Sequence, residues 1–419
     1  MLSFHHRRPL FAVASGLAAL ALFGGVADAE PAPPFTELLR QAQSTAPRLA
    51  EARAEIARAE GLARQASAFP NPTIGLEVEN FSGSGPFQGI SQAETTASLG
   101  QTLELGGKRS ARIAAGQAEV QASRQRAARA QADFGFDLAS AYAEAEATDR
   151  RLVLARETLS LAEEDARISR AFVEAGREPD LRRIQADASL QAARASVEEA
   201  QAARSTAFAN LTALAGSPRP ITSIAISLLD QAPVLGVAGL AATTAPGLRV
   251  AQAEREAATR RLSFERRRAV PDVNVSLGFR RFEDSNASAF VAGVSVPLPL
   301  FDRNRGNISA VQAEVSAAEA RLNAARLDAE AALRSGMARQ QAAEARLSAS
   351  KDGELAAREA YRLTRIGYEG GKLSLAELLV ARRALTDART QTIAAAVDRV
   401  NAQAALTRLS GAPGPGESK

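Results

Sequence analysis

A tandem repeat with an offset of 195 residues is the feature that most constrains the fold. Three landmarks return at this offset: Gln117-Ala118-Glu119-Val120 as Gln312-Ala313-Glu314-Val315, Gly176 as Gly371, and Gly216 as Gly411. Agreement of separate landmarks at one offset is typical of an internal duplication. The chain is therefore expected to fold as two similar halves, each with the same order of elements.

Each half contains a pair of alternating apolar and polar segments in an otherwise helical pattern. The first pair lies within Asn71 to Arg109, and the second pair comprises residues 272–280 and 289–298. Apolar residues at every second position predict strands with one apolar and one polar face. Strands of about nine or ten residues are long enough for a tilted span of a bilayer. One strand, 97–105, fits less well because Gln101 lies on its apolar face.

Long helices are predicted on both sides of each strand pair. Apolar and small residues recur in steps of three and four, which is the pattern of a coiled-coil seam. The expected helices run from near Thr36 to Pro70, from Lys108 to about Ala175, from Leu181 to Ala215, from Gly306 to the turn 368–372, and from there to Gly411. At 1.5 Å per residue the second helix would be about 100 Å long. The fold class is therefore mostly α with a small β part.

The chain divides at changes of composition. A basic start, an apolar run and Ala27-Asp28-Ala29 predict a signal peptide over residues 1–29. The first repeat is expected over 30–216, a Pro-containing linker folded against the helices over 217–245, the second repeat over 246–411, and a flexible tail over 412–419. The chain has no cysteine, which excludes disulfides and a cysteine-linked lipid anchor.

Composition also excludes several classes of function. Both histidines lie in the predicted signal peptide, and Met337 is the only methionine after it, so no metal site or metal cofactor is expected. No catalytic constellation or Gly-rich phosphate loop is evident, which argues against an enzyme. The 51 basic and 47 acidic residues are mixed along the helices, and this is typical of solvated helix faces, not of nucleic-acid binding.

The strand pattern predicts an oligomer. Two pairs supply only four strands, and an open sheet edge is not viable in hydrocarbon. Because membrane barrels begin at about eight strands, several chains must contribute to one wall. Their helices would close into a tube beneath it, so the assembly would be a hollow conduit from the outer membrane of a Gram-negative bacterium into the periplasm. The alternative is a soluble sheet packed on a layer of helices.

Three strings resemble a known family. NPTIGLEVENFSGSG, AETTASLGQTLELGGKR and IGYEGGKLSLAELLVARRAL are similar to the TolC-type outer membrane efflux proteins, and more narrowly to the CzcC-type components of cobalt–zinc–cadmium resistance pumps. The resemblance covers essentially the whole chain after residue 29. It implies a homotrimer with a barrel of about twelve strands and an α-barrel of about twelve helical columns. It also implies a periplasmic adaptor and an inner-membrane, proton-driven pump of the resistance-nodulation-division class as partners, besides outer membrane lipid.

The resemblance also suggests roles for individual residues. Those expected at the periplasmic tips, where an adaptor would dock, are Gly176, Arg177, Asp180, Tyr368, Gly371 and Lys372. Glu377 matches an acid of the periplasmic gate, whereas the first copy has Arg182 there, with Asp180 or Asp187 as its nearest acid. Whether the gate has one or two acidic rings therefore stays open, as does a solvated role for Glu377 and Arg182. Gly106, Gly107 and Lys108 are expected at the joint between barrel and helices.

The expected function is a passive efflux conduit for heavy-metal cations such as cobalt, zinc and cadmium. One alternative is a channel of the same kind for organic drugs or other small molecules. A periplasmic adaptor is less well supported, because such a protein would have one helical hairpin flanked by small β-domains instead of two tandem copies.

Overall fold

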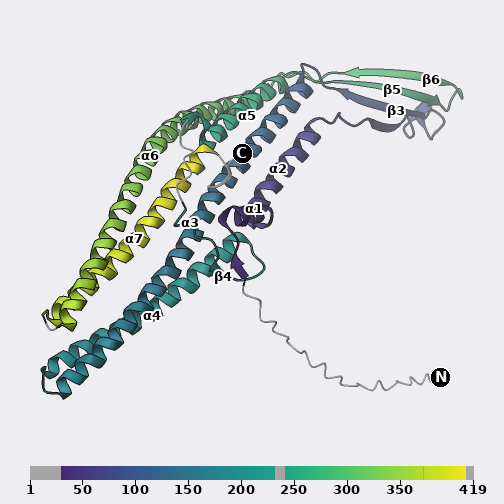
Figure 1. The fold of residues 1–419 in the computed structure, drawn as a ribbon. Coiled ribbons are helices and arrows are strands. Elements are labelled where there is room, and N and C mark those ends of the chain that lie inside the picture. Colours follow the sequence, from purple (N-terminus) through teal and green to yellow (C-terminus); the bar gives the residue numbers. More distant parts are fainter. Residues whose placement is uncertain (1–29, 232–240, 371, 412–419) are drawn as a thin grey trace, which may run out of the picture.

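The computed structural model of the protein describes residues 30–231, 241–370 and 372–411. The predicted signal peptide, the tail and Gly371 lie outside this part. The molecule is elongated, with a four-stranded sheet at one end and two helical hairpins reaching to the other (Figure 1). No described helix combines the length and the apolar character needed to cross a membrane.

Two very long helices connect the two ends. They are α3 (Lys108–Glu174) and α6 (Arg305–Glu369), with 67 and 65 residues. The shorter helices α4 (Asp180–Ala215) and α7 (Leu375–Ser410) return beside them. Both return helices end at a glycine with positive φ, 62° at Gly216 and 67° at Gly411, a conformation that glycine adopts without strain. The expected long helices and their returns are thus confirmed.

The helix before the first strands is broken, which corrects the prediction of one continuous helix from Thr36 to Pro70. The structure has α1 (Phe35–Thr45) and α2 (Pro47–Ala66). Proline excludes the preceding residue from helical geometry, and Ala46 is extended with ψ 126°. Pro47 itself is accepted as the first residue of α2. The second copy starts its corresponding helix α5 (Pro246–Arg268) at a proline as well.

The four-stranded sheet joins the two repeats. Its strands are β2 (Thr73–Glu79), β3 (Glu94–Leu103), β5 (Val273–Phe282) and β6 (Ser288–Ser295). The order is β2-β3-β5-β6 with every neighbour antiparallel. The two hairpins therefore meet at β3 and β5, where Leu99 pairs with Leu277. Strands β2 and β6 remain as the outer edges of the sheet.

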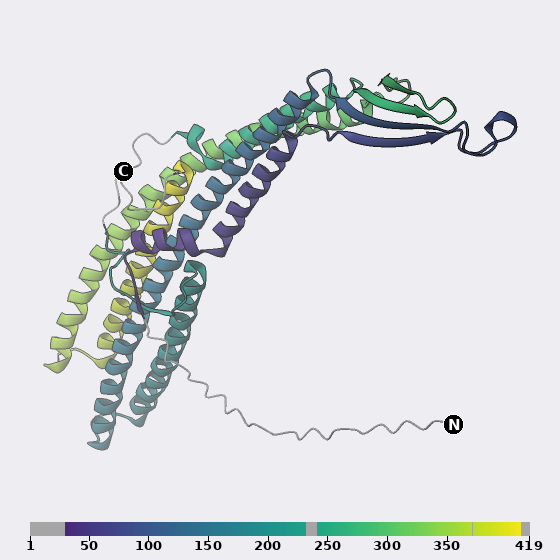
Figure 2. The same ribbon diagram turned by 90° about the vertical axis from the view of Figure 1, so that its right-hand side faces the viewer.

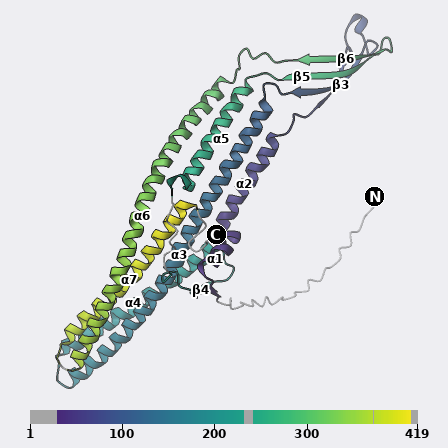
Figure 3. The same cartoon turned by 45° about the horizontal axis from the view of Figure 1, so that its top comes forward.

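The helices follow the same lateral order as the strands. The long helix α3 packs on α2 and α4 on one side and on α5 and α7 on the other, and α6 packs on α5 and α7 (Figure 3). The elements α2 and α4 thus lie at one open edge of the curved layer, and α6 lies at the other. Each edge of the molecule thus ends in an edge strand and an edge helix: β2 with α2 and α4 on one side, and β6 with α6 on the other.

The largest core lies midway along α3. Leu138, Ala139, Tyr142 and Ala143 are inaccessible there, and the Phe35 ring meets the Tyr142 ring edge to face at 5.8 Å between centroids. Residues 221–229 of the segment predicted as a linker pack against this core (Figure 2). This segment adds a strand that was not expected, β4 (Ile221–Ile224), which pairs in parallel with β1 (Glu30–Ala32). A short 3₁₀ turn, η2 (Ala242–Thr244), then leads into α5; another, η1 (Gly85–Phe87), lies in the β2–β3 loop.

Candidate functional site

The sheet has one apolar and one polar face. Strand register places most of the large apolar side chains of the four strands on one side: Ile74, Leu76, Val78, Leu99, Val275, Leu277, Phe279, Phe290 and Val294; Phe282 and Val291 lie on the other side. Most of them are exposed in the single chain, including Ile74 and Phe290 at 88% and 91%. An exposed apolar face of this extent needs an apolar environment. This is the outward face expected of a membrane wall.

Gln101 lies on this apolar face opposite Val275. Its side-chain amide donates hydrogen bonds to the carbonyls of Pro70 at 2.9 Å and Thr102 at 3.1 Å. The residue sits at the helix-proximal end of β3, two residues before the strand ends. The polar amide is therefore satisfied by backbone, and the apolar orientation of strand 97–105 is retained.

The opposite face alternates small residues with hydroxyl groups. Gly75, Ser98 and Gly278 form one row across three strands, and Thr73, Gly100, Ser276 and Gly293 form the next row. A Cβ atom built on Gly100 would lie 2.7 Å from the Thr73 hydroxyl, and one on Gly293 would lie 2.7 Å from the Ser276 hydroxyl. At these glycines the face leaves no room for a larger side chain, which suits the water-facing side of a narrow wall.

A cluster of ion pairs lies on the polar face, at the end of the sheet that is remote from the helices. The Arg280 guanidinium binds Glu94 at 2.7 Å, Glu79 at 2.8 Å and the Thr96 hydroxyl at 2.8 Å. Arg280 is on β5, whereas its partners are on β2 and β3, so this group ties the two hairpins together. Glu77, on the same face, makes no ion pair within the described part of the chain.

The joint between sheet and helices contains the predicted residues. Gly106 and Gly107 both have positive φ, 66° and 70°, and they turn the chain from β3 into α3. Lys108 is buried, and its ammonium lies 2.6 Å from the Asp272 carboxylate at the start of the second strand pair. The same carboxylate accepts the Leu105 N–H at 3.3 Å. Asp272 of the second repeat thus binds two groups at the joint of the first repeat.

At the first hairpin tip, two acidic side chains are paired with arginines of the same hairpin. Gly176 has φ 70° and its N–H donates to the Val173 carbonyl, while Arg177 N–H donates to Phe172. Asp180, the first residue of α4, is bound by Arg183 at 2.7 Å, and this guanidinium holds the pKa of Asp180 below its ordinary value. Asp187 is paired with Arg170 at 2.6 Å. Both acids that could form a ring in this copy are therefore occupied.

Arg182 makes no ion pair within the described residues. Its backbone N–H donates to the Pro179 carbonyl at 3.0 Å, in the first turn of α4.

The second tip caps its helix with the predicted gate acid. The Glu377 carboxylate accepts the Ser374 backbone N–H at 2.7 Å, and the Ser374 hydroxyl accepts the Glu377 backbone N–H at 3.3 Å, which makes a capping box at the start of α7. The backbone N–H of Ser374 lowers the pKa of the exposed Glu377 carboxyl, and its hydroxyl contributes further. Lys372 N–H donates to the Gly367 carbonyl at 2.8 Å. Gly371 lies outside the described residues.

The two tips lie side by side (Figures 1 and 3). Tyr368 of the second tip is near the carboxylate of Glu178 in the first. Burial raises the pKa of the Tyr368 hydroxyl, and the nearby charge of Glu178 raises it further. The structure thus brings Tyr368 to the first tip, whereas Glu377 stays exposed on its own helix.

Two ion pairs that sequence reasoning missed connect the hairpins above the tips. Arg382 of α7 is bonded to Asp165 of α3, and both side chains are largely buried at 12% and 20% exposure. Higher up, Arg389 of α7 lies 2.6 Å from Glu157 of α3. Burial raises the pKa of Asp165 even with Arg382 beside it. The partners are more than 200 residues apart in the sequence, so no local pattern could have paired them.

A third connection lies at the level of the main core. The buried Glu146 carboxylate of α3 accepts the N–H groups of Leu228 and Leu229 at 2.8 and 3.1 Å. It also binds the Ser227 hydroxyl and Arg150, each at 2.6 Å. From the other side, the buried Arg399 of α7 donates to the Leu229 carbonyl at 2.9 Å. Segment 226–230 therefore fastens the first repeat to the second.

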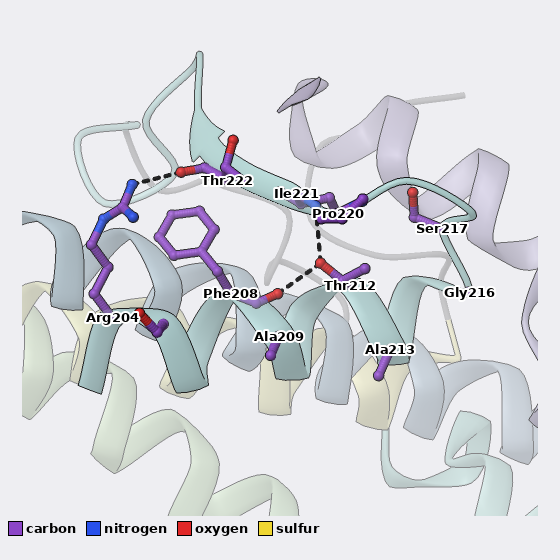
Figure 4. A pocket seen from close by; sticks show the side chains of 11 residues that line it. Arg204, Phe208, Ala209, Thr212, Ala213, Gly216, Ser217, Pro220, Ile221 and Thr222 are labelled. Atoms are coloured by element: carbon purple, nitrogen blue, oxygen red, sulfur yellow. Dashed lines mark hydrogen bonds between the residues drawn. The ribbon is translucent and has the colours of Figure 1, made fainter. Parts of the chain in front are cut away.

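The neighbouring surface hollow is not a separate ligand site. It lies between α4 and β4 and has a volume of about 700 Å³ (Figure 4). Thr212 accepts the Ile221 N–H at 3.0 Å and donates to the Phe208 carbonyl, while Arg204 donates to the Thr222 carbonyl at 2.5 Å. These groups hold β4 on α4. In the described part of the chain, no group of three or more acidic or histidine side chains could hold a metal ion.

The sequence matches a known protein family over most of its length. The family described as "Outer membrane efflux protein" matches residues 38–217 and 237–412. The chain is 41% identical over 396 residues to the nickel-cobalt-cadmium resistance protein NccC of Alcaligenes xylosoxydans xylosoxydans, covering 94% of this chain and 90% of the relative. It is 28% identical to the cobalt-zinc-cadmium resistance protein CzcC of Cupriavidus metallidurans, covering 87% and 86%.

Solved structures agree on the fold. The crystal structure of CusC superposes with a TM-score of 0.75 at 18% identity, covering 90% of this chain and 92% of that one. The expected architecture of long helical hairpins with four strands per chain, and the expected resemblance to the heavy-metal branch, are confirmed. The chain belongs to the outer membrane efflux protein family.

Proposed function

We propose that this chain forms the outer membrane channel of a tripartite pump that exports heavy-metal cations. The observation that carries the proposal is the 41% identity to a nickel, cobalt and cadmium resistance protein over nearly the whole chain. The chain itself offers no soft metal ligands after residue 29 apart from Met337, so the channel is a passive conduit. Selection of the ion is then left to an inner-membrane pump of the resistance-nodulation-division class, reached through a periplasmic adaptor.

The open edges support a closed homotrimer. Strand β2 and helices α2 and α4 form one edge, and strand β6 and helix α6 form the other. Such an edge cannot stay unpaired in hydrocarbon, so β6 of one chain would pair with β2 of the next. Three chains would give a barrel of about twelve strands, within the range of known barrels. The apolar face would then meet lipid, and the Gly and Ser rows would line the lumen.

Deletion of the gene is expected to lower the resistance of the host to nickel, cobalt or cadmium ions. Growth is measured across these ions, zinc and a few organic drugs, and the deletion strain is complemented with the full chain. Loss of tolerance to metals alone supports the proposal. Loss of tolerance to the drugs alone would instead assign the channel to organic substrates, the alternative that the family fold also permits.

We propose further that Glu377 lines the periplasmic gate as a single acidic ring. The carboxylates of the first copy support this, because Asp180 and Asp187 are each held by an arginine. Glu377 makes no ion pair within the described residues. Three such charges around one axis would repel unless a cation bridges them, and a bridging cation would hold the gate closed. The tip residues Gly176, Arg177, Tyr368 and Lys372 would meet the adaptor, as would Gly371.

Glu377→Gln is expected to raise the conductance of the channel in planar bilayers. Glutamine keeps an oxygen that can accept the Ser374 N–H and so preserves the capping box, while it removes the charge. Glu369→Gln is the matched control, because Glu369 lies near the same tip in an exposed pair with Arg365. If Glu377→Gln conducts as the wild type does and only Glu377→Ala differs, the residue acts as a helix cap and not as a gate.

A further inference from the structure

The apolar face of the sheet continues past the last strand residues into the joint. After Val294 the alternation runs on through Val296, Leu298 and Leu300 in the loop between β6 and α6. Leu298 and Leu300 are 74% and 65% exposed, and Phe301 is fully exposed. A hydrogen bond from Leu300 N–H to the Leu298 carbonyl at 2.8 Å turns the chain at this point. In the single chain these large apolar side chains are therefore exposed just beyond the edge strand β6.

A basic band borders this apolar loop. Helix α5 ends in Arg266, Arg267 and Arg268, and Arg303 and Arg305 lie at the start of α6. Some of these side chains have local partners: Arg268 binds Glu265, Arg267 donates to the Gly106 carbonyl, and Arg303 donates to the Pro299 carbonyl. Arg266 and Arg305 make no ion pair or side-chain hydrogen bond with the described residues. Their guanidinium donors are available to an external anion.

The position of the charges at the start of α6 opposes the helix dipole. The N-terminus of a helix carries partial positive charge and favours acids. Helix α6 nevertheless begins with Arg305 and has no acid in its first turn, and α3, which starts at the same level, begins with Lys108 and Arg109. The helices that start at the opposite end follow the rule, with Asp180 in α4 and Glu377 in α7. An anionic surface at the joint would explain the difference.

A hollow at the joint lies beside the apolar loop, between the end of α5 and the start of α6. It has a volume of about 500 Å³, and Arg268, Leu298, Phe301 and Lys108 are among the residues that line it. Asn304 fixes one side by donating to the Glu265 carbonyl and carboxylate, each at 2.8 Å. The hollow thus has an apolar wall beside charged groups of both signs: Lys108 is paired with Asp272, Arg268 is paired with Glu265, and Asp302 also lines it. Its shape is held by the hydrogen bonds of Asn304 between α5 and the loop.

We propose that the joint segment 296–305, together with Arg266, binds the headgroups of anionic phospholipid in the periplasm-facing leaflet. Leu298, Leu300 and Phe301 would enter the boundary between headgroups and acyl chains, as an extension of the apolar face. Arg266 and Arg305 would bind the phosphates, because long basic side chains reach the headgroup level from an apolar surface. The inference rests on the proposed channel function, which places the sheet in the membrane and the joint at its inner surface.

The test uses the full-length protein in nanodiscs of phosphatidylcholine and phosphatidylglycerol. After exchange into detergent, the lipids that each chain retains are counted by mass spectrometry. The wild type should be enriched in phosphatidylglycerol over the bulk mixture, and salt should reduce this enrichment. Each arginine contributes roughly a factor of five, so Arg266→Gln with Arg305→Gln should lower the apparent affinity for phosphatidylglycerol by up to about 30-fold. Phe301→Ser should reduce retention of both lipids without changing their ratio.

The control variant is Arg321→Gln with Arg326→Gln. These exposed arginines also lie on α6 and make no ion pair with the described residues, but they begin about 24 Å further along the helix. The inference is overturned if the joint variant keeps the wild-type lipid ratio or if the control loses as much. It is also overturned if the joint variant loses SDS-resistant trimers in either lipid, because the face would then pack against a second copy. If the wild type inserts and conducts but retains lipids at the bulk ratio, only this inference fails; absence of insertion overturns the channel as well.

Discussion

Replacing Glu146 with alanine is expected to lower the free energy of unfolding by about 3–5 kcal/mol, because buried backbone donors lose their acceptor at about 1–3 kcal/mol each. Glu146 is only 6% exposed, and its carboxylate holds the segment 226–230 against α3. The measurement is chemical denaturation of the solubilised protein, followed by the helical circular dichroism signal. The same segment also accepts a hydrogen bond from Arg399 of α7, so it connects the two repeats. Loosening it should disturb how the repeats pack, and the variant should therefore yield fewer SDS-resistant oligomers.

The large effect follows from the number of groups that share one carboxylate. The N–H groups of Leu228 and Leu229 lose their acceptor in the alanine variant, whereas the Ser227 hydroxyl keeps a second acceptor, Asp230, at 3.0 Å. Buried donors left without a partner each cost about 1–3 kcal/mol. Arg150 keeps Asp230, at 2.5 Å, as a second partner, which limits the loss on that side. The expected cost is therefore dominated by the backbone donors of the segment and not by the arginine.

Glu144→Ala is the matched control for this prediction. Glu144 lies two residues away on α3, and its pair with Arg151 is exposed, with side-chain exposures of 47% and 37%. Exposed pairs of this kind contribute about 0–1 kcal/mol. Equal destabilisation by Glu144→Ala and Glu146→Ala would mean that the segment 226–230 is not held by the buried carboxylate.

Much of the fold could be predicted because its signals are local. The stepped seam and the glycine turns predicted α3, α4, α6 and α7, and the alternation in Asn71 to Arg109 predicted two strands. The break at Pro47 was missed because the apolar spacing continues across it, although the proline itself carries the signal. Gln101 obscured the orientation of its strand, since the Pro70 carbonyl that satisfies it was visible only in three dimensions.

The candidate site was less predictable, because its connections join distant parts of the chain. Glu146 lies beside the seam position Ala145 and one turn after Tyr142, so a carboxylate near a core position was the only sequence signal of the segment it binds. Its backbone partners are more than 80 residues further along the chain. Likewise, the glycine turns predicted where both helical hairpins reverse but gave no sign of the pair between Asp165 and Arg382. Sequence periodicity describes single helices, and these contacts depend on how four helices pack.

If the chain forms the proposed channel, replacing Asp165 with leucine is expected to open the tip end of the helical hairpins and to raise single-channel conductance several-fold. Arg382 is only 12% exposed, and without Asp165 it becomes a buried cation with no partner on α3. An uncompensated buried charge typically costs several kcal/mol, and separating α7 from α3 would return it to water. The change is measured with the full-length protein in planar bilayers, where the wild type should remain mostly closed. Unchanged conductance would show that the pair does not hold the hairpins together.

The double variant Asp165→Leu with Arg382→Leu separates charge from packing. Burial, together with the nearby charge of Glu164, raises the pKa of Asp165 in spite of Arg382, so desolvation offsets much of the attraction in this pair. Replacing both partners of such a pair by apolar residues is often neutral or stabilising, so the double variant should stay closed although each single variant opens. Glu157→Leu is the control: it removes the partner of Arg389 between the same two helices, but its side chain is 54% exposed, and only a small change is expected. A double variant that conducts like the single variants would show that the ion pair itself closes the tip.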